Sequence, residues 1–561
     1  MENLSRRNLI KYLLFFCLGL GIFLILAGAI YFFFGSNSPK INPQSSSVIS
    51  LDRSQNCGSK SSGPTDNPIL VKYGENAYPW TNNIKWNCVY NIKDFSGKNL
   101  GEQFNSAMNA AVFNGGGVIY FPAGTYNFTD SIFLKNGVII RGETPKVIDA
   151  KVDGYVLTSK LVFPKYEPNF SSKGTDNTTG FKKIFTSNAE LDSNIGLINL
   201  DINRAGINFG GEIDRVKKQN IIIFGVRNNN VADPDNKVPD SSFQESWMRY
   251  SDRFTANIKV SALANVLIAN NRLNDSITDN YDQPGYKVQS LDKKEVITYV
   301  EGNKVPFDYG NHYGIVVNRT KSQGFALAGN PKNEPGLFRK GIVIRDNWVF
   351  HKMRVGIHAA GDGLMIKDNV ILDRVNKQWW TDPTGIRQPR GAVTFENRAI
   401  DWSGWNVQIE GNNYQVYRHR VMDTPYLSVD GEGILIQECC GGTTVNKAAI
   451  INNQGNGYIG IYKVPEIKNV TIRGNKLSSS EVDKYMIYVV ADTNKAPYSM
   501  SQVLIEDNEL SGGIVAKSSL GGTGNIIRNN SGKNGTIEYS CNITVDNNTR
   551  FIVKPCLPEK K

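Results

Sequence analysis

Carboxylates, a histidine and basic side chains gather between residues 358 and 463. Asp430-Gly431-Glu432-Gly433 places two carboxylates at the start of one apolar segment, and Glu396 ends another. Sugar chemistry needs either two carboxyl groups acting as acid and base, or a carboxylate-bound cation with a basic residue as proton acceptor. The two glycines would let a substrate or a cation such as calcium approach the backbone closely. The predicted catalytic residues are Glu396, His358, Asp430, Glu432, Glu438, Arg398 and Lys463.

Four of the eight tryptophans of the chain flank the same stretch. Flat aromatic faces suit sugar rings, which offer C–H surface with hydroxyls at the edge. The predicted substrate-binding residues are Trp379, Trp380, Trp402, Trp405, Tyr462 and Gln437. Packing of long loops onto the body of the protein explains the tryptophans equally well, and charged residues line the surface of any soluble fold.

The elements that must position these side chains repeat along the chain. Nine heptads share one form, with apolar residues at alternate positions and an asparagine at the end. Such a heptad predicts a strand with one buried face, closed by an asparagine that tolerates left-handed backbone and can bond its equivalent one repeat away. A tenth, at 220, lacks the final asparagine. The heptads are 265 NVLIANN, 341 GIVIRDN, 363 GLMIKDN, 406 NVQIEGN, 447 KAAIINN, 469 NVTIRGN, 502 QVLIEDN, 524 GNIIRNN and 541 CNITVDN.

A second short strand, usually led by glycine, lies between most heptads. Two or three strands per repeat without intervening helices predict a solenoid and exclude a TIM barrel, and a propeller would need four antiparallel strands per blade. The predicted inward row of these strands is Ile315, Ile357, Val393, Ile434, Ile459 and Ile487. The two predicted outward rows are Val316, His358, Thr394, Leu435, Gly460 and Tyr488, and then Asn318, Ala360, Glu396, Gln437, Tyr462 and Val490.

The start of the folded part carries a family resemblance. Apolar residues at helical spacing from Leu100 to Phe113 precede Gly115-Gly116-Gly117, then VIYFPAGTY and GVIIRG. This order resembles the opening of pectate-lyase-superfamily (pectin-lyase-like) domains. The resemblance implies an all-β fold, a right-handed single-stranded parallel β-helix with an N-terminal capping helix, and a catalytic groove on the outer face.

The same resemblance limits the activity that can be predicted. The superfamily includes lyases, hydrolases, epimerases and phage tailspikes. The hydrolase motifs Asn-Thr-Asp, Asp-Asp, Gly-His-Gly and Arg-Ile-Lys are absent, and Asp233-Pro234-Asp235 only partly matches the epimerase motif Asp-Pro-His. A polysaccharide lyase is therefore favoured by elimination, while a non-catalytic carbohydrate-binding protein and an adhesive solenoid stay open.

The N-terminus predicts a membrane anchor. No charge occurs from Tyr12 to Phe34, a run of 23 residues preceded by Arg6, Arg7 and Lys11. This length spans a bilayer as a helix, and the preceding positive charges keep residues 1–11 cytoplasmic. Ala27-Gly28-Ala29 leaves a cleaved signal peptide as the alternative. Residues 35–79 are predicted to be a flexible linker and residues 80–558 an extracytoplasmic β-helix domain.

Charge and cysteines agree with this placement. The formal net charge of +11 favours acidic partners, whether polyuronide, nucleic acid or anionic lipid, and the absence of a basic motif argues against nucleic acid. Together with the family resemblance, the predicted partner is a polysaccharide, an acidic one. In an oxidising compartment Cys57–Cys88 and Cys541–Cys556 could each staple an end of the domain.

Overall fold

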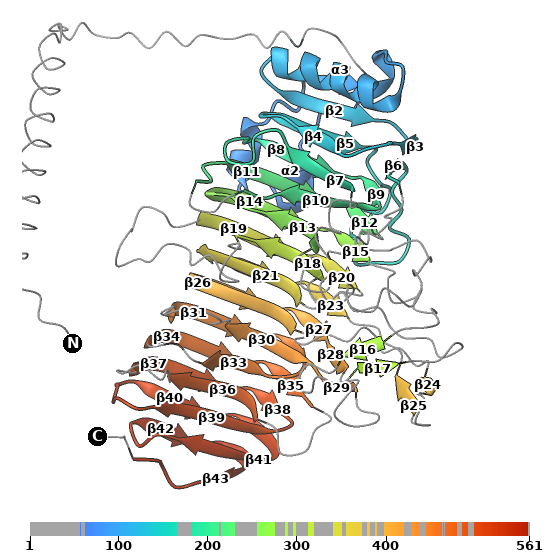
Figure 1. Ribbon diagram of the computed structural model, residues 1–561. Coiled ribbons are helices and arrows are strands. Elements are labelled where there is room, and N and C mark those ends of the chain that lie inside the picture. The colour runs from blue at the N-terminus through green and yellow to red at the C-terminus, as the bar shows by residue number, and fades with distance from the viewer. Residues whose placement is uncertain are drawn as a thin grey trace, which may run out of the picture. The chain divides into compact units, whose positions relative to one another are not determined.

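The computed structural model describes residues 57, 62–164, 182–211, 215–229, 255–274, 287–289, 296–298, 312–318, 340–350, 355–372, 379–381, 387–389, 398–419, 428–436, 445–462, 464, 466–479, 485–491 and 499–558. They belong to a compact unit that begins at Cys57. Its strands stack in successive coils from helix α3 at one end to β43 at the other (Figure 1). One 37-stranded sheet holds these strands. Its pairs are parallel, so the predicted parallel β-helix is confirmed and a propeller is excluded.

Three columns of stacked strands form the walls of the solenoid. The first column contains β1 (Val89–Asn91), β2 (Gly117–Phe121), β5 (Val138–Gly142), β8 (Ile195–Ile198), β11 (Gln219–Phe224), β14 (Ala264–Ala269), β19 (Lys340–Arg345), β22 (Met365–Lys367), the end of β26 (Arg398–Glu410), β31 (Val445–Ile451), β34 (Glu466–Arg473), β37 (Ser499–Glu506), β40 (Asn525–Arg528) and β42 (Ile543–Asp546). The second contains β3 (Gly124–Asn127), β6 (Ser159–Val162), β9 (Asp201–Asn203), β12 (Arg227–Asn229), β15 (Arg272–Asn274), β20 (Trp348–Phe350), β23 (Val370–Leu372), β27 (Asn413–Gln415), β32 (Gln454–Asn456), β35 (Lys476–Ser478), β38 (Glu509–Leu510) and the start of β41 (Ser531–Tyr539), on which β43 (Thr549–Val553) lies. The third contains β4 (Ile132–Leu134), β7 (Lys182–Thr186), β10 (Ala205–Phe209), β13 (Thr255–Val260), β18 (His312–Val317), β21 (Val355–Asp362), the start of β26, β30 (Glu432–Ile436), β33 (Ile459–Tyr462), β36 (Tyr485–Ala491), β39 (Gly513–Ser518) and the end of β41.

The heptads form the first column, and their alternation fills the core. In β34, Val470 and Ile472 are buried while Thr471 is half-buried and Arg473 is exposed. Equivalent inward residues of successive coils lie against one another in a single hydrophobic cluster that extends from α3 to β42. Burial of one isoleucine side chain contributes roughly 2 kcal/mol, so the stacked rows supply most of the stability.

A ladder of nine buried or half-buried asparagines runs along the corner after the heptads. From Asn347 onward, each Oδ1 accepts a bond from the backbone N–H and from Nδ2 of the asparagine one coil earlier, as Asn347 does from Asn271 at 3.1 and 2.9 Å. Asn271 Oδ1 accepts from the N–H of Val226. Nδ2 of each also reaches an isoleucine carbonyl, so the amides are satisfied. The members are Asn271, Asn347, Asn369, Asn412, Asn453, Asn475, Asn508, Asn530 and Asn548.

The predicted bonds between asparagines are thus confirmed. The prediction that the closing asparagine itself has left-handed backbone is wrong by one residue. Positive φ occurs at the residue before each ladder asparagine, for example at Asp346 and Asn452, and again at the first heptad position, for example at Asn265. At the last repeat the heptad itself is displaced by one, because Asn547 is left-handed and Asn548 makes the ladder bond.

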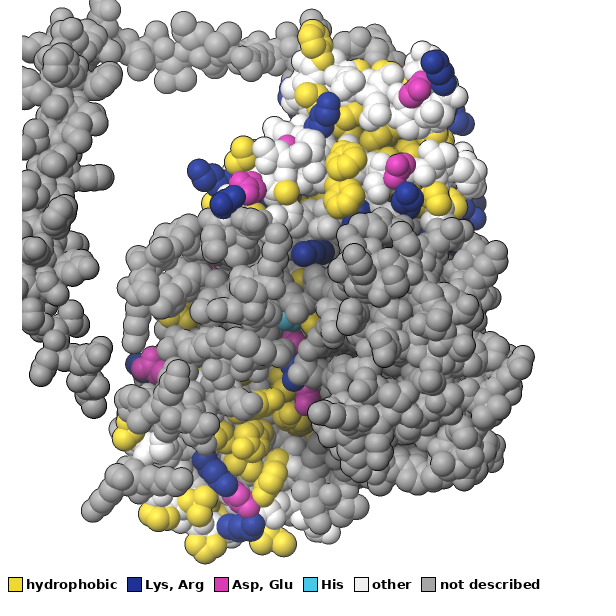
Figure 2. All heavy atoms as spheres, in the orientation of Figure 1, with side chains coloured by type: hydrophobic (Ala, Val, Ile, Leu, Met, Phe, Trp, Pro, Cys, Tyr) yellow, Lys and Arg dark blue, Asp and Glu magenta, His cyan; other side chains and the backbone are white. Residues whose placement is uncertain are grey.

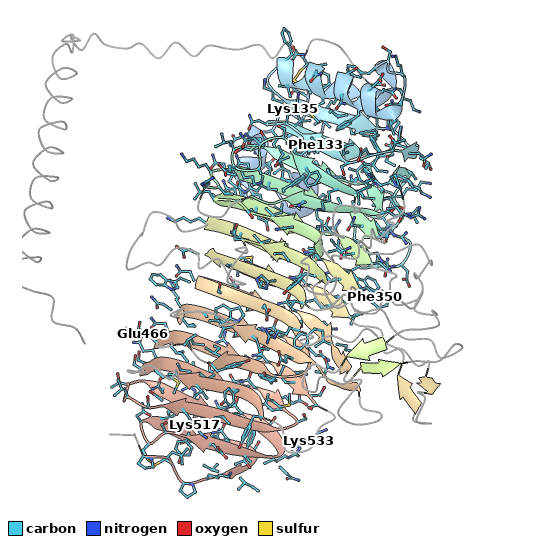
Figure 3. All side chains as sticks on the ribbon, viewed as in Figure 1. Phe133, Lys135, Phe350, Glu466, Lys517 and Lys533 are labelled. Atoms are coloured by element: carbon cyan, nitrogen blue, oxygen red, sulfur yellow. A yellow bond between two sulfur atoms is a disulfide. The ribbon has the colours of Figure 1, made fainter. Side chains whose placement is uncertain are left out.

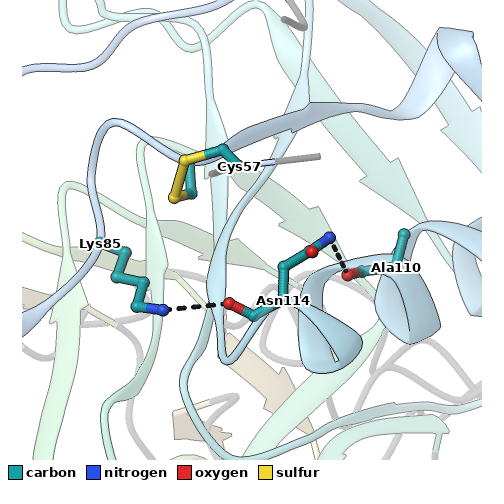
Figure 4. Close-up of a disulfide and its surroundings, with 5 residues drawn as sticks. Cys57, Lys85, Ala110 and Asn114 are labelled. Carbon is teal, nitrogen blue, oxygen red and sulfur yellow. Dashed lines mark hydrogen bonds between the residues drawn. A yellow bond between two sulfur atoms is a disulfide. The ribbon is translucent and has the colours of Figure 1, made fainter. Parts of the chain in front are cut away.

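Helix α3 (Leu100–Phe113) closes the N-terminal end, as predicted. Asn99 Oδ1 caps it by accepting from the N–H of Glu102, and the Glu102 carboxylate reaches back to the N–H of Lys98. At the other end Asn114 donates to the Ala110 carbonyl and its own carbonyl accepts from Lys85, beside the disulfide of Cys57 (Figure 4). Phe104 and Met108 are buried against the first coils, so the helix covers apolar surface that would otherwise meet water.

Both predicted disulfides form, Cys57–Cys88 and Cys541–Cys556. The first shows that part of the predicted linker belongs to the folded unit. Helix α2 (Pro68–Tyr73), followed by the 3-10 turns η1 (Pro79–Asn83) and η2 (Ile92–Asp94), begins twelve residues before the expected boundary at residue 80. Ile69 is fully buried against the outer face of the first column, which the low apolar content of residues 35–79 did not reveal.

The predicted membrane span, residues 12–34, lies outside the described residues. Within the described ranges, none of the helices is both long and apolar enough to cross a bilayer.

Three antiparallel hairpins project from one corner of the solenoid. Each lies in the chain between a second-column and a third-column strand, and Figure 1 draws them on the same side. They are β16–β17 (Lys287–Gln289 and Val296–Thr298), β24–β25 (Trp379–Thr381 and Arg387–Pro389) and β28–β29 (Tyr417–His419 and Ser428–Asp430).

Candidate functional site

The outer face of the third column carries one continuous row of side chains. Strand register defines it, because each member pairs with the next across the parallel ladder. Its character changes along the solenoid from aromatic to ionisable and then to mostly apolar, with Glu538 at the C-terminal end. The row is Phe133, Phe185, Asn208, Lys259, Val316, His358, Asp401, Leu435, Gly460, Tyr488, Val515 and Glu538.

The predicted rows were wrong in one coil. Ile357 pairs with Ile400, and Ile400 pairs with Ile434, so Ile400 holds the inward position that was assigned to Val393. Asp401 and Ser403 therefore occupy the outward positions assigned to Thr394 and Glu396. Residues 391–397, with Glu396, lie outside the described part of the chain.

Asp401-Trp402-Ser403-Gly404-Trp405 is part of a strand and not a loop. Strand β26 runs through all five residues and on into the 406 heptad without interruption. Gly404, at φ 126°, lies at the corner, where a side chain would collide with the Gly361 carbonyl of the coil before. One strand therefore belongs to two columns, an arrangement that a search for separate short strands does not find.

Trp402 is fully buried in the solenoid and cannot stack on a sugar, contrary to the prediction. Its strand neighbours at the same inward level are Ala359 and Ile436, and the small alanine leaves room for the indole. Trp405 is half-buried on β26. Trp379 and Trp380 lie on hairpin strand β24, where only the backbone is described, so their predicted sugar contact remains a prediction.

Four ionisable side chains from three successive coils meet in the middle of the row. They are His358 on β21, Arg398 and Asp401 on β26, and Glu432 on β30, and together they are called the charged group below. Asp401 lies 3.5 Å from His358 Nδ1 and 3.4 Å from Arg398 Nη1, while Arg398 Nε donates to Glu432. Figure 2 shows a histidine with acidic and basic side chains gathered on this face of the middle coils.

The charged group is removed from water. The side chains of His358, Asp401 and Arg398 are 2%, 1% and 7% exposed, and Glu432 is 20% exposed. Attraction between charges is much stronger here than at a solvated surface, and removing one partner leaves an uncompensated charge. Arg398 stands between two carboxylates and balances one of them.

Tyrosines surround the charged group. Tyr313 packs edge-on against the His358 ring at 5.6 Å between centroids, and Tyr462 meets Tyr488 in the same way at 5.7 Å. Burial, together with the nearby Glu432 charge, raises the pKa of both Tyr458 and Tyr462. Both hydroxyls therefore stay protonated at any physiological pH.

The structure brings together four of the predicted site residues: His358, Arg398, Glu432 and Tyr462. Asp430 lies on β29, two residues before Glu432, with only its backbone described. Predicted residues outside the described part are Glu396, Gln437, Glu438 and Lys463. Sequence reasoning missed Asp401, Tyr313 and Tyr458. Ile400-Asp401-Trp402-Ser403 alternates apolar and polar residues as a strand with one buried face does, but Val393-Thr394-Phe395-Glu396 alternates in the same way, so this pattern alone did not select Asp401.

A calcium site is not evident where side chains can be compared. Among the described residues, no group of three or more His, Cys, Asp and Glu side chains is arranged to hold a metal ion.

Comparison with known proteins adds only distant likenesses. No protein-family model matches the chain, and no curated protein matches it. Among solved structures, the surface adhesin PfbA of Streptococcus pneumoniae is similar over 83% of this chain and 90% of that chain, at 11% identity and a TM-score of 0.39. The tailspike of E. coli bacteriophage HK620, in complex with a pentasaccharide, is similar over 82% and 80%, at 11% identity and a TM-score of 0.37. At these values neither protein's properties extend to this chain, and its class, a parallel β-helix protein, rests on its own strand pairing.

Proposed function

We propose that this protein is an extracytoplasmic enzyme that cleaves an acidic polysaccharide by β-elimination, held at the membrane by residues 12–34. The single observation that carries the enzymatic part is the charged group, in which a histidine, a guanidinium and two carboxylates contact one another beside protonated tyrosines. Buried ionisable residues that contact one another are frequent components of catalytic sites. We also propose that the β-helix is right-handed and that the protein is related to the pectate-lyase superfamily.

The roles follow from what β-elimination on a uronate requires. A base removes the proton next to the carboxylate, the electron pair forms a carbon–carbon double bond, and the glycosidic oxygen leaves with a proton. His358 is assigned as the base, and Asp401 orients its ring and stabilises the proton that it takes. Tyr462, kept protonated, is assigned as the donor to the leaving oxygen, and Arg398 offsets the charge of the uronate carboxylate.

A specific observation favours a second function, binding without turnover. Arg398 already contacts both Asp401 and Glu432. In this second function the charged group has the purely structural role of joining three coils, while the outer face binds glycan. A group that is nearly buried must open, or take substrate through its Glu432 side, before it can react. Turnover decides between the two functions.

The test is a screen of the full-length protein on pectate, alginate and related polyuronides, with and without calcium, followed by ultraviolet absorbance of the unsaturated product. Asp401→Asn keeps the size of the side chain and removes its charge, and it should lower kcat at least about a hundredfold. Glu506→Gln is the matched control, because Glu506 is similarly buried and paired with Arg528 on the outer face of the first column. Full activity in Asp401→Asn, or equal loss in both variants, would refute the assignment. Binding without turnover on every glycan would establish the second function.

A further inference from the structure

The N-terminal end of the outward row carries an exposed aromatic pair that the charged group does not use. Phe133 on β4 and Phe185 on β7 pair directly across the parallel ladder. Their rings stack with centroids 5.3 Å apart and planes 16° from parallel. Phe133 remains 51% exposed, and Figure 3 shows it on the face below α3, near Lys135. The rigid strand thus holds a flat hydrocarbon face exposed to water.

Basic side chains surround this pair. Lys183 Nζ lies 5.6 Å from the centroid of the Phe185 ring, and Lys135 donates to the neutral amide of Asn109. Lys182 is held 3.1 Å from Asp130. The Asp130 carboxylate accepts from the Ser131 N–H and pairs with Lys182, so the charges of Asp130 and Lys182 offset each other. Lys135 and Lys183 place two further positive charges close to the aromatic pair.

We propose that Phe133, Phe185 and Lys183 form a binding site for an acidic polysaccharide, distinct from the charged group. A sugar ring stacks its C–H face on the free face of Phe133, and Lys183 and Lys135 attract its carboxylate. β4 is the first third-column strand among the described residues, so no stacked side chain from an earlier coil covers that face. This site rests on the proposed class of substrate but not on catalysis.

The row also relates the two sites in space. Phe185 and His358 are four steps apart along it, through Asn208, Lys259 and Val316. At the spacing of stacked strands this is about 19 Å. A chain of several sugars can reach both sites at once, whereas a monosaccharide or disaccharide can occupy only one. Phe133 should therefore increase the affinity for long chains, and it should have no effect on the shortest chains that the charged group turns over.

Stacking and charge favour a glycan over a lipid surface. Insertion into a bilayer needs a broad, protruding apolar face, whereas here one half-exposed ring stands on a regular strand between lysines. Binding to vesicles containing anionic phospholipid is the contrasting outcome in the test.

The experiment measures binding of the full-length protein to polyuronide fragments of graded length by calorimetry. Phe133→Ala should weaken binding of long fragments about five- to tenfold, and Phe133→Tyr should restore it because the flat ring returns. Lys183→Gln should weaken binding about two- to fivefold and reduce its dependence on salt. Phe113→Ala is the control, since Phe113 is 90% exposed on α3, outside the row.

Each outcome decides the proposal. Unchanged affinity in Phe133→Ala, equal loss in Phe113→Ala, absence of binding to any polyuronide, or binding to anionic vesicles alone overturns it. Asp401→Asn separates this site from the proposed catalysis, because it should abolish turnover while leaving the binding that depends on Phe133. Loss of Phe133-dependent binding in Asp401→Asn would show that the two sites are one.

Discussion

The asparagine ladder and the charged group are both built by stacking equivalent positions of successive coils, but they use opposite principles. The ladder repeats one residue from Asn271 to Asn548, and every member makes the same bonds to the next. The charged group places different residues on three coils, and each contact within it occurs once. Repetition gives the buried polar groups at this corner of each coil their hydrogen-bond partners. Departure from repetition creates a local chemistry that one coil alone cannot provide.

The largest effect should come from placing a charge in the repeated interior. Ile472→Asp buries an unpaired carboxylate between Ile450 and Ile505 and should lower the free energy of unfolding by roughly 5 kcal/mol. Its neighbour Thr471 faces outward, so Thr471→Asp should cost within about 1 kcal/mol. Urea denaturation compares the two, and equal losses would contradict the strand phase.

Breaking the ladder in its middle should have the next largest effect. Asn453→Leu removes the acceptor of Asn412 and the donor to Ile409 and Asn475, which leaves several buried polar groups unsatisfied. We expect a loss of roughly 4 kcal/mol. Asn548→Leu, at the half-buried last step, should lose clearly less. A ladder variant as stable as the unchanged protein would show that these bonds do not hold the coils together.

The charged group should show the third largest effect, because its one guanidinium is shared by two carboxylates. Arg398→Met leaves Asp401 and Glu432 without this cation and should lower the free energy of unfolding by roughly 3 kcal/mol at neutral pH. Lys367→Met, which removes the more exposed ion pair with Glu410, is the control and should cost within about 1 kcal/mol. Urea denaturation compares the two variants, and equal losses would contradict the role of burial in the charged group.

The smallest effect is expected at the C-terminal end of the outward row. Hydrogen bonds from Lys517, and then from Lys554 and Tyr485, lower the pKa of Glu538 from 4.5 to about 2. A carboxyl whose pKa is depressed by folding adds stability above the unfolded value, and this stability is lost as the pH falls from about 4.5 to about 2.

Glu538→Gln should therefore flatten the stability profile in that window. The change should stay below about 1 kcal/mol, because the lysines are 34% and 52% exposed and water screens the attraction. Thermal melts at pH 6 and pH 3 measure it, and an unchanged slope between them would contradict the role of these bonds.

Much of the repeated structure could be predicted from the sequence because each of its signals is local. Helix α3, the heptad strands, the bonds between asparagines and both disulfides follow from short patterns in which each residue has one plausible environment. The earlier start of the fold, with Ile69 buried on the outside of the first column, escaped notice because a short helix in a polar segment has no period to reveal it.

The sequence by itself determined that the chain stacks apolar strands into a solenoid, since the same heptad recurs and can bury its face only against its neighbours. Tertiary structure alone decided which residues share the outer row. Val393–Glu396 and Ile400–Ser403 alternate in the same way, and only the pairing of Ile400 with Ile357 and Ile434 shows that the second segment lies in the third-column strand. That pairing turns Asp401 toward His358 and Trp402 into the core, because a shift of register changes which residues face outward in a strand.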